Sequence, residues 1–333
     1  RVSLLPIPNV FTHLPLSGTM TVAVTEKQAT VQFSDGTSMV LSNEQLCLDR
    51  CNVWAGHTVG WWIGSTGREC FLMSENYIQG IWRARYFWTH LALADLRARW
   101  RRSFLGVLWS IIQPLGMTLL LAIVLSKMFK SDIYTYAPYI LSGIIFWECI
   151  TACVTGGALS FVQADAYIKQ CKHPLAIYTL RTVLTSLIVL ALASTSLLGW
   201  SAIVLPQNIG LHWLAILTVF PILGLILWPL STLLAYIGAR FRDVPHATGL
   251  VMQALWFLSP VYFEAKMFRQ GGLDFLVDYN PIYHLLQIVR APLLEGKWPS
   301  LENYLFTFVA VVVFSLIAWL VGRSAERKVI FYL

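Results

Sequence analysis

The chain has 333 residues, of which 57% are hydrophobic and only 12% are charged, whereas a soluble domain has about 25% charged residues. The shortage of charge is concentrated in residues 104–322, where several apolar runs reach about 20 residues, the length that crosses a bilayer. This composition excludes a wholly soluble protein. Basic residues beside these runs account for the net charge of +7, so we do not expect binding to nucleic acid.

The first 78 residues predict a small β-rich domain. Polar and apolar residues alternate over 21–24, 30–33 and 38–41, and a Ser-Asp-Gly sequence at 34–36 supplies turn residues before the third segment. Two more short strands are expected around the turn at 64–67. We expect this domain to be cytosolic because of the charge distribution described below.

The cysteines do not require a metal site. In the N-terminal region, Cys47, Cys51 and His57 leave a zinc site open as an alternative, but their spacing is loose and no second Cys-x-x-Cys follows. Reduced thiols are the simpler interpretation for a cytosolic domain. Cys149 and Cys153 lie one helical turn apart in an apolar run and are expected to be packed thiols.

Residues 79–104 predict an amphipathic helix, because helix-forming residues dominate and no Gly or Pro interrupts 81–104. An aromatic and aliphatic stripe flanked by arginines is typical of a helix in the lipid headgroup layer. A soluble helix packed on the β-rich domain is the alternative. The stripe consists of Trp82, Tyr86, Leu93, Leu96, Trp100 and Phe104, and its flanks of Arg83, Arg85, Arg97, Arg99, Arg101 and Arg102.

Residues 105–333 predict an all-α polytopic membrane domain with about six transmembrane helices. The expected spans are 105–126, 137–162, 177–204, 213–238, 247–264 and 303–322. Two apolar pieces between the last two spans, 273–277 and 281–294, are too short to cross a bilayer. We therefore expect two re-entrant or interfacial helices there.

The distribution of Lys and Arg predicts the orientation of these spans. With the N-terminus inside, fourteen of these residues near the span ends lie on the inner side and six on the outer side. Because basic residues are enriched on the cytosolic side, both termini and the β-rich domain are expected to be cytosolic. The six outer residues are Lys127, Lys130, Lys266, Arg269, Arg290 and Lys297.

No nucleotide-hydrolysing or hydrolase motif is present in the sequence. It contains no G-x-x-x-x-G-K-[ST] phosphate loop, no H-E-x-x-H and no G-x-S-x-G. The chain is therefore not expected to hydrolyse a nucleotide by itself. Glu148 is the clear charged residue inside a predicted span, which makes it a candidate functional residue. A position at an interfacial end, or a bond to a neighbouring helix, is the alternative.

Four segments, in order, resemble the permeases of type-2 ABC exporters, and among these the group that exports O-antigen, capsule and teichoic acid. The resemblance covers about residues 83–333. The segments are RARWRRSFLGVLWSIIQPL (97–115), YIKQCKHPLAIYTLRTVL (167–184), ARFRDVPHATGLVMQALWFLSPVYF (239–263) and YNPIYHLLQIVRAPLL (279–294).

This resemblance implies an assembly and a set of roles. Two permeases would pair in the bacterial cytoplasmic (inner) membrane and dock two separate ATPase subunits, which bind ATP and Mg, while this chain binds no cofactor. The amphipathic helix would be a gate, and the short loop before the third span would couple to the ATPase. The residues are Lys169, Cys171, Lys172, His173 and Pro174 for coupling, Arg97, Arg99, Trp100, Arg101 and Arg102 for the gate, and Asn280, Pro281 and Arg290 for the outer re-entrant segment.

The resemblance also implies a substrate, a glycan on polyprenyl pyrophosphate or on another lipid. Arg97, Arg99, Arg101 and Arg102 would contact the pyrophosphate, or else anchor the helix on anionic lipid. A type-2 ABC exporter of another lipid or a drug is one alternative. Others are a membrane enzyme acting on a polyprenyl-linked sugar, for which the sequence lacks a cluster of acidic or His residues, and a proton-driven flippase, which should carry more charges within its spans.

Overall fold

The computed structural model describes residues 21–25, 28–32, 38–42, 77–130, 132–170 and 173–332. The chain divides into two units, Arg1–Ser74 and Glu75–Leu333, each described here by itself. Cys47, Cys51 and His57 lie outside the described residues. The zinc alternative therefore remains a prediction.

The first unit contains a three-stranded antiparallel sheet in the order β1-β2-β3. The strands are β1 (Thr21–Thr25), β2 (Gln28–Gln32) and β3 (Ser38–Ser42), close to the three segments of alternating residues. Val22 pairs with Val31, which pairs with Met39 on the other side. These strands alone do not establish a β-rich domain over residues 1–78, which stays a prediction.

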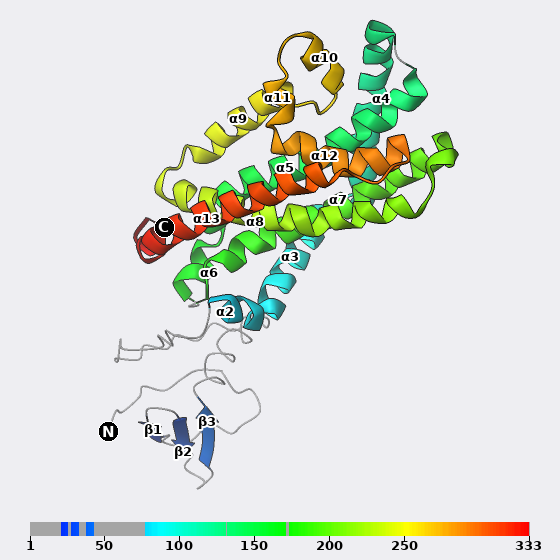
Figure 1. The fold of residues 1–333 in the computed structure, drawn as a ribbon. Coiled ribbons are helices and arrows are strands. Elements are labelled where there is room, and N and C mark those ends of the chain that lie inside the picture. Colours follow the sequence, from blue (N-terminus) through cyan, green and yellow to red (C-terminus); the bar gives the residue numbers. More distant parts are fainter. Residues whose placement is uncertain are drawn as a thin grey trace. The chain divides into compact units, whose positions relative to one another are not determined.

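The second unit is helical (Figure 1). Five helices are long and apolar enough to cross a membrane, which makes the chain a multi-pass membrane protein. The helices are α2 (Tyr77–Arg83), α3 (Arg85–Trp100), α4 (Trp109–Phe129), α5 (Ile133–Gln163), α6 (Asp165–Gln170), α7 (Ala176–Val204), α8 (Ala215–Arg240), α9 (Val244–Leu258), α10 (Ala265–Gln270), α11 (Phe275–Asp278), α12 (Pro281–Arg290) and α13 (Leu301–Tyr332). Short helical turns lie at Gly106–Leu108, Pro206–Asn208, Leu211–Leu214 and Ala291–Glu295.

One predicted span is wrong as a continuous helix. Residues 247–264 were expected to cross the membrane, but α9 has only 15 residues and ends at Leu258. At 1.5 Å per residue it covers about 22 Å of the roughly 30 Å of hydrocarbon. The helix stops here because Pro260 has no N–H to donate and disfavours helical geometry at the preceding Ser259.

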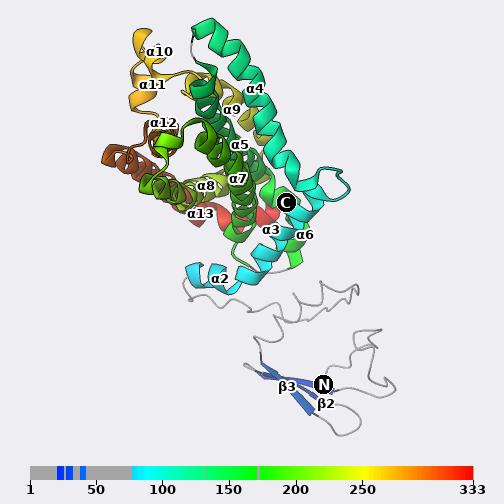
Figure 2. The same cartoon turned by 90° about the vertical axis from the view of Figure 1, so that its right-hand side faces the viewer.

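Helix α5 is the centre of this unit (Figure 2) and contacts α4, α7, α8 and α9. Its most apolar window is 67% buried, against 17% for α4 and for α13, so α5 supplies most of the core. Cys149 and Cys153 lie in this core as buried free thiols, which confirms the prediction of packed thiols.

Small residues let α5 and α8 approach closely. A Cβ added at Gly238 on α8 would lie 2.1 Å from the carbonyl oxygen of Ala158 on α5. A Cβ added at Gly157 would lie 2.7 Å from the Cβ of Ser231, whose hydroxyl donates to the carbonyl of Cys153 at 2.9 Å. Such backbone contact is the usual way in which membrane helices pack, since lipid gives no hydrophobic drive to association.

Gly238→Ala should destabilise the protein, because the added methyl group would overlap backbone rather than a flexible side chain. We expect a loss of about 1–3 kcal/mol, the usual cost of overpacking. Gly199→Ala is the matched control, since nothing lies within 4 Å of its added Cβ. Thermal unfolding in detergent should separate the two variants, and an unfolding temperature for Gly238→Ala equal to that of Gly199→Ala would contradict the close contact.

Candidate functional site

Helix α3 carries the residues expected to form the gate. Arg97 and Arg99 are exposed near its end, Trp100 is half-buried, and Arg101 and Arg102 are exposed beyond it. The amphipathic segment is not one continuous helix, because Ala84 separates α2 from α3 and Trp100 is the last residue of α3.

The predicted stripe of α3 does not form a single surface. Trp82 and Tyr86 are 66% and 68% exposed, whereas Leu96, from the same stripe, is buried. The Arg85 guanidinium lies 5.5 Å from the Trp82 ring centroid and 4.6 Å from that of Tyr86, so the outward face is aromatic and cationic. The inward face uses small residues that the stripe did not include, among them the buried Ala84 and Ala92.

An ion pair holds α3 against α7. The guanidinium of Arg181 donates through Nε and Nη2 to the two carboxylate oxygens of Asp95. Asp95 is the only acidic residue of α3, and Arg181 is the only Lys, Arg, Asp or Glu in α7. A bidentate pair fixes both distance and orientation. Sequence reasoning missed this pair, although two lone opposite charges on neighbouring helices were a usable signal.

The predicted coupling segment lies directly against α2 and α3. The ring of Phe87 on α3 lies 5.1 Å from that of His173 and 6.2 Å from that of Tyr167 on α6. Pro174 packs on Gly80 of α2, where an added Cβ would be 3.1 Å from the proline ring. The structure thus brings the predicted coupling and gate elements together.

The other coupling residues are placed less fully. Lys169 is exposed on α6 and forms an ion pair with Asp165 at 2.9 Å. Cys171 and Lys172 lie outside the described residues. Their part in coupling stays a prediction.

At the far end of α9, Asn280 joins two elements. Its Oδ1 accepts a hydrogen bond from the backbone N of Ile282 at 2.9 Å, and its Nδ2 donates to the hydroxyl of Ser259 at 2.9 Å. Pro281 occupies the first position of α12, where its missing N–H costs nothing. The Asn-Pro pair therefore begins α12 and ties it to the residues that follow α9.

Arg290 is buried, with an exposed fraction of only 2%, at the end of α12. Its guanidinium donates to the carbonyl oxygens of Pro260 at 2.8 Å, Val261 at 2.5 Å and Tyr139 at 3.2 Å, and to the hydroxyl of Ser142 at 3.1 Å. It also stacks on the Tyr139 ring at 3.7 Å. One side chain thus satisfies backbone oxygens that the break after α9 leaves without helical partners.

Two tyrosines of α5 complete this clamp, which we define as Arg290, Tyr136 and Tyr139 around residues 259–263. The Tyr136 hydroxyl donates to the Tyr262 carbonyl at 2.6 Å, and the Tyr139 hydroxyl donates to that of Phe263 at 2.9 Å. Gly143 lets residues 259–263 pack against α5, because a Cβ at this position would lie only 2.1 Å from the Val261 carbonyl oxygen.

Glu148 lies near the midpoint of α5 and is exposed. An interfacial end and a bond to a neighbouring helix were the alternatives for this residue, and its part in function stays a prediction. Among the described residues, no hydrogen bond or ion pair involves its side chain.

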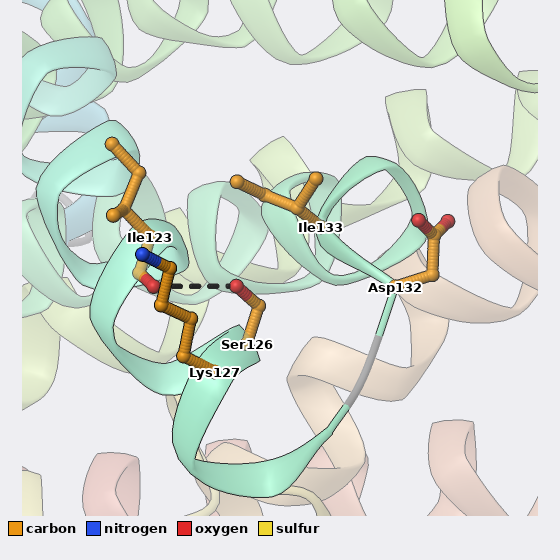
Figure 3. A pocket seen from close by; sticks show the side chains of 5 residues that line it. All are labelled: Ile123, Ser126, Lys127, Asp132 and Ile133. Carbon is orange, nitrogen blue, oxygen red and sulfur yellow. Dashed lines mark hydrogen bonds between the residues drawn. The ribbon is translucent and has the colours of Figure 1, made fainter.

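The pockets of the described residues show no catalytic arrangement. A pocket of about 390 Å³ lies between the end of α4 and the start of α5 (Figure 3). Its two charged side chains, Lys127 and Asp132, point to different sides, while the Ser126 hydroxyl donates to the Ile123 carbonyl at 3.3 Å. A second hollow of about 400 Å³ between α5, α8, α9 and α12 is lined almost wholly by apolar side chains.

Exchanging the charges of the ion pair should test its role in placing α3. Asp95→Arg and Arg181→Asp should each destabilise the protein, because like charges would then face each other. The double variant should recover most of the loss, with a coupling energy of about 1–3 kcal/mol. A double-mutant cycle from thermal unfolding measures this energy, and purely additive single effects would contradict a direct pair.

Arg290→Lys should weaken the protein more than an exposed substitution of the same kind. A lysine retains the charge but lacks the planar fork that reaches several acceptors at once. Arg269→Lys is the matched control, because Arg269 is half-exposed and bonds Asp278 at 2.7 Å. We expect about 2–4 kcal/mol less stability for the first variant, because removing a buried hydrogen-bonding partner is strongly destabilising. Equal unfolding temperatures for the two variants would argue against the clamp.

Residues 87–294 match the model of a family described as "ABC-2 type transporter". The match extends from α3 through α9 and the clamp to the turn after α12. It therefore includes both places where the predicted site residues gather.

Individual relatives have low sequence identity to this chain, but the alignments cover most of each relative's length. The O-antigen export system permease protein RfbA of Myxococcus xanthus is 25% identical over 75% of this chain and 95% of its own. The protein of the same name from Klebsiella pneumoniae is 21% identical over 70% of this chain and 88% of its own. The polysialic acid transport protein KpsM of Escherichia coli is 21% identical over 67% of this chain and 88% of its own. Because the family model matches well over half of the residues, the chain belongs to the ABC-2 type transporter family.

Proposed function

We propose that this chain is the membrane-spanning subunit of an ATP-driven exporter of lipid-linked polysaccharide. Two copies would pair, and two separate ATPase subunits would bind ATP and Mg and supply hydrolysis, since the sequence has no phosphate loop. The names of the relatives support a polysaccharide as the substrate. The observation that carries the mechanism is the contact between the coupling segment and α3.

The geometry suggests how a movement of the ATPase subunits would be passed to the membrane domain. The exposed α6 with Lys169, and the following loop, would sit on the ATPase. A movement of this loop would act through His173 and Tyr167 on Phe87, and through Pro174 on Gly80. The Asp95–Arg181 pair would then make α3 move together with the start of α7.

The contacts also support an orientation with both ends on one side. Arg240, at the end of α8, lies 5.8 Å from the ring of Tyr332 at the end of α13. Ala239 near the end of α8 and Val329 near the end of α13 pack in one buried cluster with Ile81 of α2 and Ala176 of α7. The ends of α8 and α13 and the starts of α2 and α7 thus share one side.

We assign this side to the cytosol of a bacterial cell, with the chain in the cytoplasmic membrane, because most Lys and Arg near the span ends lie there. In this assignment α9 and residues 259–264 make one broken passage, which keeps the number of crossings even. The segment from α10 to α12 would re-enter the membrane from the outside. The β-rich domain would be cytosolic.

The exposed arginines of the α3 end suit the lipid carrier. Arg97, Arg99, Arg101 and Arg102 are all exposed and close in sequence. Guanidinium groups bind phosphate oxygens in pairs of hydrogen bonds, so this cluster would meet a polyprenyl pyrophosphate at the inner leaflet. Anchoring on anionic lipid is the competing role, and it would not depend on the carrier.

Other functions fit the observations less well. An exporter of another lipid or a drug would share the fold, but the relatives' names favour a glycan. A membrane enzyme acting on a polyprenyl-linked sugar would need a cluster of catalytic groups at one membrane face. The pockets of the described residues hold no such cluster.

Co-expression of the chain with a candidate ATPase subunit tests this function. We expect a stable complex that hydrolyses ATP only when assembled in lipid, and glycan at the cell surface. Phe87→Ala should leave the complex intact but lower export several-fold, because the ring links α6 to α3. Leu93→Ala is the control, because the Leu93 side chain lies on the outer side of α3 and is 42% exposed. A chain that purifies without any ATPase partner would argue for the membrane-enzyme alternative.

A further inference from the structure

The face of α5 that carries Glu148 is the most unusual surface of the membrane unit. Glu148 is the only Asp, Glu, Lys or Arg more than two turns from an end of the five candidate spans. It is exposed, although α5 is the most buried of these helices. The next residue, Cys149, is buried in the core, so the exposure belongs to one side of the helix.

Small and hydroxyl-bearing residues continue this face along the helix. Ala152 is exposed one turn after Glu148, and Thr151, Thr155 and Gly156 are half-buried beside it. The Thr155 hydroxyl donates to the Thr151 carbonyl at 2.7 Å. The Thr151 hydroxyl itself has no hydrogen-bond partner among the described residues. The exposed part of this face therefore carries a carboxylate and a small side chain, unlike the apolar outer faces of α4 and α13.

Contact with lipid hydrocarbon would be unfavourable for this face. A carboxylate near the middle of the hydrocarbon is costly unless it meets water or a polar partner. Within the described part of the chain, Glu148 forms no ion pair.

We infer that this face of α5 lines the path of the exported glycan and that Glu148 accepts hydrogen bonds from sugar hydroxyls. The inference rests on the proposed function and names a contact within it. Two carboxylate oxygens can accept from two neighbouring hydroxyls of one sugar ring. The small side chain of the exposed Ala152 leaves room for a sugar ring beside Glu148, whereas Gly156 lies against Thr182 of α7.

Thiol labelling of the chain in membranes, co-expressed with its ATPase, tests whether the face meets water. Ala152→Cys should react with a membrane-impermeant cationic thiol reagent. Val312→Cys is the matched control, because Val312 is 48% exposed at the midpoint of the Leu301–Arg323 span. It should react at least about tenfold more slowly, since a charged reagent enters hydrocarbon poorly. Peptide mass spectrometry separates these sites from the native cysteines, and the buried Cys153 should stay unlabelled.

The occupant of the face is tested by comparing cells that make the glycan with cells that do not. Slower labelling of Ala152→Cys in cells that make the glycan supports the inference. Equal labelling in both cells overturns the glycan contact. Labelling only by a lipid-soluble maleimide, or a disulfide between two copies of the variant, also overturns it, because lipid or a second copy would then cover the face.

Substitution of Glu148 tests its contact directly. Glu148→Leu should lower surface glycan several-fold, and Glu148→Gln, which keeps one acceptor oxygen, should lose less. Both variants should still assemble with the ATPase. Wild-type export by Glu148→Leu would overturn the contact. An absence of surface glycan in the wild type would instead refute the proposed function, and the labelling by charged reagent would still report whether the face meets water.

Discussion

Every backbone carbonyl and N–H at membrane depth needs a partner inside the protein, and this constraint shapes the second half of the molecule. Helix α9 stops at Leu258, and the carbonyls of residues 260–263 take their hydrogen bonds from side chains instead of helical N–H groups. Arg290, Tyr136 and Tyr139 provide the donors, and Gly143 provides the space. Three positions on α5 and one on α12, about 150 residues later, therefore support one irregular segment. The position of α12 follows from the same requirement, since it must carry Arg290 to that segment.

The end of the unit where α2, α3, α6 and α7 meet depends on a different kind of contact. Rings, a proline and an ion pair join α2, α3, α6 and α7. The aromatic contacts are short-range and tolerate sliding, whereas the Asp95–Arg181 pair is directional. α3 is thus held firmly at one place and more loosely elsewhere, which suits an element that must change its position while staying attached.

Sequence reasoning located the five long apolar helices, because apolar length alone decides whether a helix can span. It was wrong about residues 247–264, where apolar character continues but the Ser259-Pro260 pair ends the helix. It named Arg290 and Glu148 as candidates but could not say that one is buried and the other exposed. Burial depends on partners such as Ser142 and Pro260, which lie 148 and 30 residues away from Arg290. The Asp95–Arg181 pair, 86 residues apart, was missed for the same reason.

The close approach of α5 and α8 sets a limit on how the molecule can work. Gly238 and Gly157 bring backbone against backbone and side chain, and the Ser231 hydroxyl bonds across to Cys153. Neither helix can turn or slide without breaking these contacts, so the two helices behave as one rigid pair. A passage that widens for a polymer would therefore do so by moving less buried helices such as α4 around this pair. The rigid α5–α8 pair would keep Glu148 at a constant depth throughout the transport cycle.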